Sequence, residues 1–156
     1  MATTATISIA SSGILSNPIT ISKTMTMYKH NTTSTVVDQL NYHRLEVPLG
    51  SPTQYDLIQE SAALTGTANY IYICNASTND AQYVTISIKE EVIGSLYGGD
   101  FMLFPWSAAV HDDGSTDFDQ SGLDSTIEIQ AFGAEQVVEY ALFHSGETLI
   151  TSDDLD

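Results

Sequence analysis

The stretch that decides the fold runs from Asn69 to Trp106 and reads NYIYICNASTNDAQYVTISIKEEVIGSLYGGDFMLFPW. In residues 69–74 and 83–88 two sets of side chains alternate, as they do in strands that present one set to each side of a sheet. We expect these two strands to pair as a hairpin through the turn-forming residues 75–80. Residues 101–104 are apolar without alternation, so this third strand is predicted to lie in the middle of a packed structure.

The same alternation appears before and after this stretch. Residues 19–28 show it most clearly and are predicted to form a half-buried strand. Residues 126–132 and 137–143 are predicted to form a second hairpin, and shorter candidates are residues 36–38 and 42–47. About eight short strands, with turns roughly every ten residues, predict an all-β chain that folds as an antiparallel β-sandwich or jelly roll.

Residues 51–66 leave two alternatives open. Ser51 and Pro52 have the outline of a helix start, with Gln54 three residues after the cap. A helix here would carry only a thin apolar stripe, so the other alternative is a strand near Tyr55 to Ile58. Both alternatives are compatible with a sandwich.

The 156 residues are enough for one domain with its own core. We divide the chain into an extended N-terminal arm at 1–18, a β-sandwich domain at 19–145 and an acidic C-terminal tail at 146–156. The arm is rich in Ser, Thr and Ala, and its composition is compatible with a strand added to the sheet edge of a neighbour. The candidate contacts with that neighbour are Ile7, Ile9, Ile14 and Leu15.

The formal net charge of -16 is unevenly distributed. All four Lys and Arg residues lie within residues 1–89, whereas residues 90–156 hold fifteen of the twenty acidic residues. Nucleic-acid binding depends on cations that neutralise phosphates, so no nucleic-acid partner is predicted. The acidic half is interpreted as a solvated surface, and the alternatives are a basic partner or a saline environment.

The N-terminus lacks the basic start and apolar core of a signal peptide. No apolar run approaches the roughly 20 residues that a membrane helix needs. We therefore expect neither secretion by the Sec route nor a membrane partner.

The most specific chemical match is a calcium loop. Asp117, Asp119, Ser121 and Glu128 fall at positions one, three, five and twelve of the EF-hand pattern. However, Asp124 stands where an apolar residue normally packs, and the flanks have the pattern of strands rather than helices. We therefore interpret this acidic segment as a solvated loop and keep calcium as the alternative.

The sequence offers little else that points to catalysis. Its four histidines, His30, His43, His111 and His144, do not pair with one another or with Cys at ligand spacing. No nucleophile-elbow pattern surrounds any serine. The single cysteine, Cys74, is interpreted as a small buried hydrophobic residue. We predict a non-enzymatic protein without a cofactor.

The apolar run that ends at Trp106 has two interpretations. It is either core, or a strand with one face in the core and the other on a second copy of the chain, because aromatic and Met side chains are enriched at the centres of interfaces. The candidate residues for such an oligomer interface are Phe101, Met102, Phe104 and Trp106.

Four motifs together resemble a known class of protein. They are NYIYICN, QYVTISI, LYGGDFMLFPW and TIEIQAFGAEQVVEYALF, and they are similar to small β-sandwich structural proteins in the virions of tailed bacteriophages. The resemblance extends over roughly residues 19–143.

This resemblance implies a capsid decoration or cement protein, often a trimer, that binds the outer surface of an assembled shell. The partner would be the major capsid protein or another virion protein, and the location would be the virion, assembled in the host cytoplasm. In this picture the arm adds to a neighbouring subunit, and residues 101–106 join copies. The alternative is a neck, tail or fibre component of a tailed phage whose loops bind a host glycan.

Overall fold

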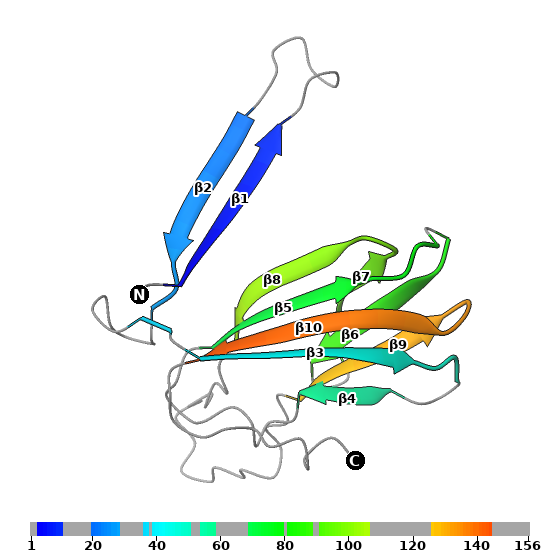
Figure 1. Ribbon diagram of the computed structural model, residues 1–156. Coiled ribbons are helices and arrows are strands. Elements are labelled where there is room, and N and C mark those ends of the chain that lie inside the picture. Colours follow the sequence, from blue (N-terminus) through cyan, green and yellow to red (C-terminus); the bar gives the residue numbers. More distant parts are fainter. Residues whose placement is uncertain are drawn as a thin grey trace, which may run out of the picture.

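The computed structural model describes residues 3–10, 20–28, 36–37, 39–50, 54–58, 69–79, 81–88, 91–106 and 126–144. These residues form ten strands (Figure 1): β1 (Thr4–Ala10), β2 (Thr20–Thr26), β3 (Gln39–Val47), β4 (Tyr55–Ile58), β5 (Asn69–Asn75), β6 (Tyr83–Ile88), β7 (Glu91–Tyr97), β8 (Phe101–Trp106), β9 (Ile127–Phe132) and β10 (Gln136–His144). None of the described segments is a helix with the length and hydrophobicity needed to cross a membrane.

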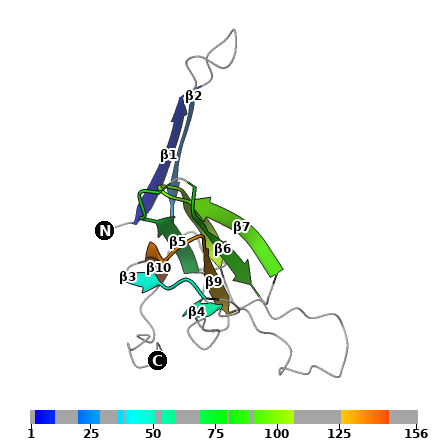
Figure 2. The same cartoon turned by 90° about the vertical axis from the view of Figure 1, so that its right-hand side faces the viewer.

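Eight of the strands form two four-stranded sheets, with the orders β3-β10-β5-β8 and β4-β9-β6-β7. All the strand pairs are antiparallel. The two sheets pack as layers (Figures 1 and 2), which confirms the predicted antiparallel β-sandwich. Within the sandwich, the first strand in sequence pairs with the last (β3 with β10), and the remaining partners nest inside them: β4 with β9, β5 with β8, and β6 with β7.

The two predicted sandwich hairpins are wrong. β5 pairs with β10 and β8, whereas β6 pairs with β7 and β9 in the opposite sheet. β9 and β10 likewise lie in different sheets. In each case the neighbouring strands pair with strands that lie elsewhere in the sequence, and the turn between them crosses from one sheet to the other instead of closing a hairpin.

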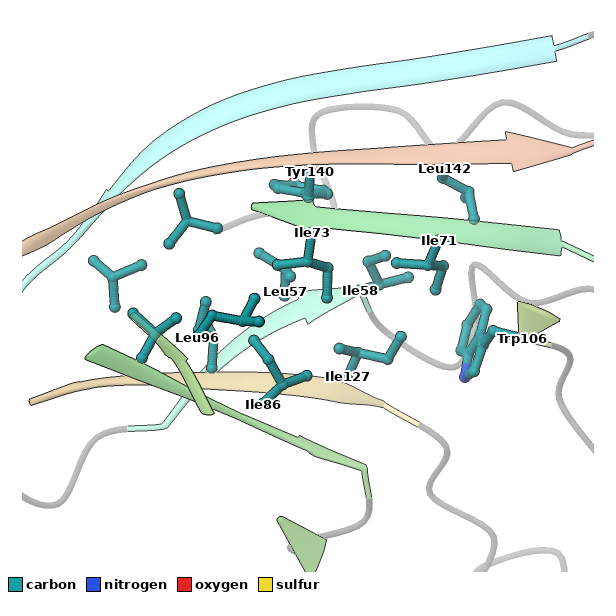
Figure 3. Packing of buried hydrophobic residues seen from close by; sticks show 14 of the residues in the cluster. Leu57, Ile58, Ile71, Ile73, Ile86, Leu96, Trp106, Ile127, Tyr140 and Leu142 are labelled. Atoms are coloured by element: carbon teal, nitrogen blue, oxygen red, sulfur yellow. The ribbon is translucent and has the colours of Figure 1, made fainter. Parts of the chain in front are cut away.

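The core lies between the inner rows of the two sheets. Figure 3 shows Ile71 and Ile73 of β5 opposite Ile86 of β6 and Ile127 of β9, and all four side chains have no exposed surface. These rows are the alternate residues of each strand, because successive side chains in a strand point to opposite faces. The buried cluster consists of Val47, Leu57, Ile58, Ile71, Ile73, Val84, Ile86, Leu96, Trp106, Ile127, Ile129, Ala131, Val138, Tyr140 and Leu142.

The strand β8 lies at the edge of its sheet and not in the middle, which corrects the prediction from its unbroken apolar run. Its inner row is Met102, Phe104 and Trp106, all in contact with the core, while Phe101 points outward and is 59% exposed. The apolar run therefore has one face in the core and one face in solvent.

The strand β7 was not predicted because Gly94 interrupts its apolar pattern. A Cβ atom at position 94 would collide with the Cε atom of Met102 in the opposite sheet. The glycine therefore allows the Met102 side chain to approach β7. The turn from β7 into β8 was predicted correctly: Gly99 has a φ of 89°, and the Asp100 amide donates to the Tyr97 carbonyl at 2.9 Å.

The strands β1 and β2 form a separate two-stranded sheet. They extend away from the sandwich (Figures 1 and 2), and β2 is exposed along nearly its whole length. The half-buried strand predicted at 19–28 is therefore corrected, and the part of the predicted arm that lies within the described residues contains β1. The physical reason is that the arm supplies β2 with an antiparallel partner whose apolar residues match its own in register.

The middle of the chain follows the expectation more closely. The strand alternative at Tyr55–Ile58 is confirmed as β4, and the strand predicted at 42–47 is confirmed as part of β3, which begins at Gln39. Of the piece predicted at 36–38, Val36 forms only an isolated bridge with Tyr28. The acidic loop at 111–125 and the tail at 146–156 lie outside the described residues.

Candidate interaction surfaces

The β1–β2 hairpin has one apolar and one polar face. The register pairs Ala5 with Met25, Ile7 with Lys23, and Ile9 with Ile21 on one face, and it pairs Thr or Ser with Thr or Ser along most of the other. The exposed fractions of Ile7, Ile9, Ile21 and Met25 are 42%, 55%, 47% and 39%. We call the six residues Ala5, Ile7, Ile9, Ile21, Lys23 and Met25 the hairpin face.

The base of the hairpin is anchored to the segment that leads into β3. The Met27 amide donates to the Thr3 carbonyl, and the Val37 amide donates to the Met27 carbonyl, both at 3.0 Å. The Thr3 hydroxyl donates to the Val37 carbonyl at 2.7 Å, and Met27 and Val37 are buried. A lone two-stranded hairpin is only marginally stable in water. These contacts hold the base of the hairpin in place, but they do not cover the hairpin face.

The outer side of the β3-β10-β5-β8 sheet carries a second apolar surface. The registers place Tyr42, Ala141, Tyr72 and Leu103 in one row across the four strands. The neighbouring rows add further aromatic and apolar residues, and Leu40, Tyr42 and Phe101 are 56%, 54% and 59% exposed. We call this surface the aromatic sheet face; it consists of Leu40, Tyr42, Tyr70, Tyr72, Phe101, Leu103, Ala141 and Phe143.

Few charges interrupt the aromatic sheet face. Arg44 donates to Glu139 at 2.7 Å in the adjoining row, and the exposed Glu46 follows on β3. A hydrogen bond with Glu139 raises the pKa of Tyr42. Burial, followed by a hydrogen bond with Cys74, raises the pKa of Tyr72 to about 12. Both phenols are therefore protonated and neutral at physiological pH.

The outer side of the other sheet is different. Its rows contain polar residues such as Thr85, Ser95 and Gln130. Only one end is aromatic, where Tyr83 stacks on Phe132 with ring centroids 5.0 Å apart and lies 5.2 Å from the ring of Tyr97. We call Tyr83, Tyr97 and Phe132 the tyrosine row.

Buried amides order the turns beside the tyrosine row. The Asn75 side-chain amide has no exposed surface; it donates to the Leu96 carbonyl at 3.0 Å and to the Gln136 Oε1 atom at 3.2 Å. The Gln136 amide donates onward to Gln82 at 3.0 Å, and Asn75 Oδ1 accepts from the Ser77 amide. These bonds join three turns of the sandwich into one network. The network satisfies its own donors and is structural.

A small cavity opens between β3 and β4. It is lined by residues that include His43, Tyr55, Asp56 and Tyr140, and its volume is about 220 Å³. The His43 ring stacks on Tyr140 at a centroid distance of 5.2 Å. Ligand sites usually measure about 300–1,000 Å³, so this cavity is too small for a typical ligand.

The predicted interface residues divide between the core and the surface. Ile7 and Ile9 lie on the exposed hairpin face, whereas Ile14 and Leu15 lie outside the described residues. Trp106 is 6% exposed and belongs to the core, which corrects its assignment to an interface. Met102 and Phe104 are partly buried against the core. Phe101 alone of the four candidates on β8 is exposed.

Sequence reasoning missed most of the aromatic sheet face. The signal was present, because Tyr70, Tyr72 and Cys74 occupy the row of β5 opposite Ile71 and Ile73. Alternation between two apolar rows marks a strand that is apolar on both sides. Cys74 is half-buried on this outer side and not in the core, which corrects its predicted place.

The metal candidates are only partly within the described structure. Asp117, Asp119 and Ser121 lie outside it, and Glu128 lies in β9. Within the described segments there is no group of three or more His, Cys, Asp or Glu side chains that is able to hold a metal ion.

Comparison with known proteins identifies no relative. No protein-family model, no curated protein and no solved structure matches the chain.

Proposed function

We propose that the chain is a non-enzymatic structural protein of a tailed-phage virion, a capsid decoration or cement protein that binds the outer surface of an assembled shell and stabilises it. The observation that carries this proposal is the anchored hairpin, which presents the apolar residues Ile7, Ile9 and Ile21 away from the sandwich. An exposed apolar surface of this kind is typical of a contact with another molecule.

The proposal includes a jelly-roll architecture for the sandwich. The nested pairing of β3 with β10, β4 with β9, β5 with β8 and β6 with β7 supports it. Jelly rolls occur in viral capsid proteins and also in lectins and cupins. This support is an analogy of fold, and the function rests on the surfaces.

In the proposed role the chain is one piece of an assembly. The hairpin engages a neighbouring subunit in the virion, and copies of the chain associate into an oligomer, for which a trimer is the expected form. The aromatic sheet face supports association, because solvent-exposed Leu40, Tyr42 and Phe101 lie on the same side of one sheet. The acidic composition supports a solvated position on the outside of the particle.

The test is immunogold labelling of virions with an antibody against the purified chain. The proposal expects gold over the head surface of particles, and stripping of the chain should make those particles less resistant to heat. Gold on no particle, with all the chain recovered in the soluble fraction of the lysate, would overturn the virion assignment.

A second candidate function is a neck, tail or fibre component that binds a host glycan. The tyrosine row favours it, because stacked aromatic rings with a 45% exposed Tyr97 at their end offer a platform for the apolar face of a sugar ring. The same labelling separates the two candidates, since gold at the tail or fibre supports this one. Binding to a glycan array that is lost in Tyr97→Ala, and kept in Tyr42→Ala on the other sheet, is its direct test.

A further inference from the structure

Among the apolar surfaces that the described residues expose to solvent, two belong to different parts of the molecule. They are the hairpin face and the aromatic sheet face. We infer that the hairpin face of one copy packs on the aromatic sheet face of a second copy, so that the chain associates with itself. This inference does not depend on the virion proposal, and it makes the neighbouring subunit that the hairpin face contacts a second copy of the chain.

The two surfaces do not meet within one chain. The hairpin is anchored at Met27 and Val37, next to the start of β3, and from there it runs away from both sheets (Figures 1 and 2). Ile9 and Ile21, which pair far from that anchor, remain 55% and 47% exposed. None of the described residues covers the hairpin face, and we assign its cover to another molecule.

The chemistry of the two surfaces is complementary. Both are faces of antiparallel sheets, which pack on each other through interleaved side chains. The hairpin face offers branched aliphatic and Met side chains, and the sheet face offers aromatic rings with the small Ala141 between Tyr42 and Tyr72. Aliphatic side chains on aromatic rings are among the favourable pairs between β-surfaces.

The charges point to the same partner. Lys23, one of only four basic residues in the chain, stands in the middle of the hairpin face, opposite Ile7. The border of the sheet face carries Glu139, which is paired with Arg44, and the exposed Glu46, so its formal charge is -1. In a chain with a net charge of -16, most contacts between copies are repulsive, and this contact places a cation beside carboxylates.

The outer side of the second sheet serves as an internal comparison. It is built on the same sandwich, yet Thr85, Ser95 and Gln130 form one of its rows, and its aromatic residues are confined to the tyrosine row at one end. Exposure to solvent alone therefore does not explain why the outer rows of the first sheet are aromatic. The aromatic sheet face fits a partner that is apolar and extended, and the hairpin face is both.

The area of the contact between the two surfaces predicts how strong it is. A strand of seven residues spans about 24 Å, and two strands with their side chains cover a width of about 10 Å. The resulting area of about 240 Å² is well below the roughly 800 Å² per partner of a stable interface. One contact is therefore weak. In a closed assembly, either a reciprocal dimer or a ring, each copy makes two contacts.

Disulfide trapping tests this contact, because the natural Cys74 lies on the same outer side of the sheet, paired in register with Phe101. The probe variants Ile7→Cys, Ile9→Cys and Met25→Cys place a thiol on the hairpin face. The matched controls Thr6→Cys, Ser8→Cys and Thr24→Cys place a thiol on its polar face. All six positions lie outside the sandwich, so the variants keep its core.

After mild oxidation, the inference expects covalent oligomers from at least one probe variant, several-fold more abundant than from its neighbour on the polar face. The crosslinks disappear when Cys74→Ser is added. Dimers that persist in Ile9→Cys/Cys74→Ser would show packing of hairpin on hairpin and overturn the inference. Dimers of the unaltered chain through Cys74 would show packing of sheet on sheet and overturn it as well. Equal crosslinking of probe and control variants would also overturn the inference, and so would the absence of crosslinks in every variant.

Discussion

The hairpin and the sandwich share an alternating sequence pattern, but the apolar residues are exposed in the hairpin and buried in the sandwich. In β2, Ile21 and Met25 alternate with Thr and Ser, as Ile127 and Ile129 alternate with Glu and Gln in β9, except that Lys23 interrupts the apolar row of β2. The two side chains in β9 have no exposed surface, whereas the two in β2 are 47% and 39% exposed. The difference is the opposing layer, because β9 faces a second sheet and the hairpin faces none.

The comparison shows what alternation in a sequence means. A period of two establishes that a strand has an apolar face, but it does not say which molecule will cover that face. In the sandwich the cover is another part of the chain. In the hairpin and on the aromatic sheet face, we propose that it is a second copy.

The largest expected effect is on the free energy of unfolding, when the same Ile→Ala substitution is made in the sandwich and in the hairpin. Ile73→Ala empties a fully buried position in β5 and should lower the free energy of unfolding by about 2–5 kcal/mol. Ile9→Ala in the hairpin, made at a dilution where the chain is monomeric, should change it by less than about 0.5 kcal/mol. Urea unfolding measures both. A comparable loss for the two variants would mean that the hairpin is packed in the monomer, and the comparison would fail.

A second contrast lies within the turns of the sandwich. Asn75→Ala removes the buried amide that donates to Leu96 and Gln136, and it leaves both acceptors without that donor. The expected loss is about 1–3 kcal/mol. Asn79→Ala is the matched control, because Asn79 is exposed and its side chain accepts only from the Ala81 amide, and about 0.5 kcal/mol is expected there. Thermal unfolding that is the same for both would show that the network is dispensable.

Much of the fold was predictable because it follows from short-range patterning. The strands around Ile71, Ile86 and Ile129 were identified from their alternation, and the class of sandwich followed from their number and spacing. The pairing was not predictable in the same way. β5 and β6 are adjacent in sequence, but whether the turn after Asn75 closes a hairpin or crosses the core depends on contacts distant in sequence.

The candidate surfaces were harder to predict than the fold. Trp106 and Phe101 belong to one apolar run, but they lie on opposite faces of β8, and only the inner face packs in the core. The partnership of β1 with β2 was missed because residues 1–18 have a composition typical of a flexible segment. Their match with residues 20–26 becomes visible only in the register of the pair.

The next prediction sharpens the comparison at the level of assembly. Ile9→Asp should remove the hairpin face, and Tyr42→Asp should disrupt the aromatic sheet face, so each variant alone should be monomeric by light scattering at concentrations where the unaltered chain associates. A one-to-one mixture keeps one of the two contacts in each mixed pair, so it should associate only at several-fold higher concentration than the unaltered chain, and there more than either variant alone. Ser8→Asp on the polar face of the hairpin is the control and should associate normally. A mixture as monomeric as its components would count against contact between the two surfaces.

The smallest expected effect concerns the aromatic sheet face in the monomer. The pKa of Tyr72 is raised from 10.0 to about 12, first by burial and then by its hydrogen bond with Cys74. The neutral phenol is thus favoured in the folded state. Its contribution to stability is fully present below about pH 10 and is lost as the pH rises towards 12, because the unfolded chain releases its proton first.

The measurement for this prediction is the urea midpoint at about pH 9.5 and about pH 11.5. The midpoint should fall between the two, and it should fall less steeply in Tyr72→Phe. Some decline should remain in that variant, because the pKa values of Tyr42 and Tyr140 are also raised. An identical decline with and without the Tyr72 hydroxyl would mean that this ring is as solvated as the hairpin residues. The aromatic sheet face would then resemble the hairpin face more closely, because its side chains would also be solvated in the monomer.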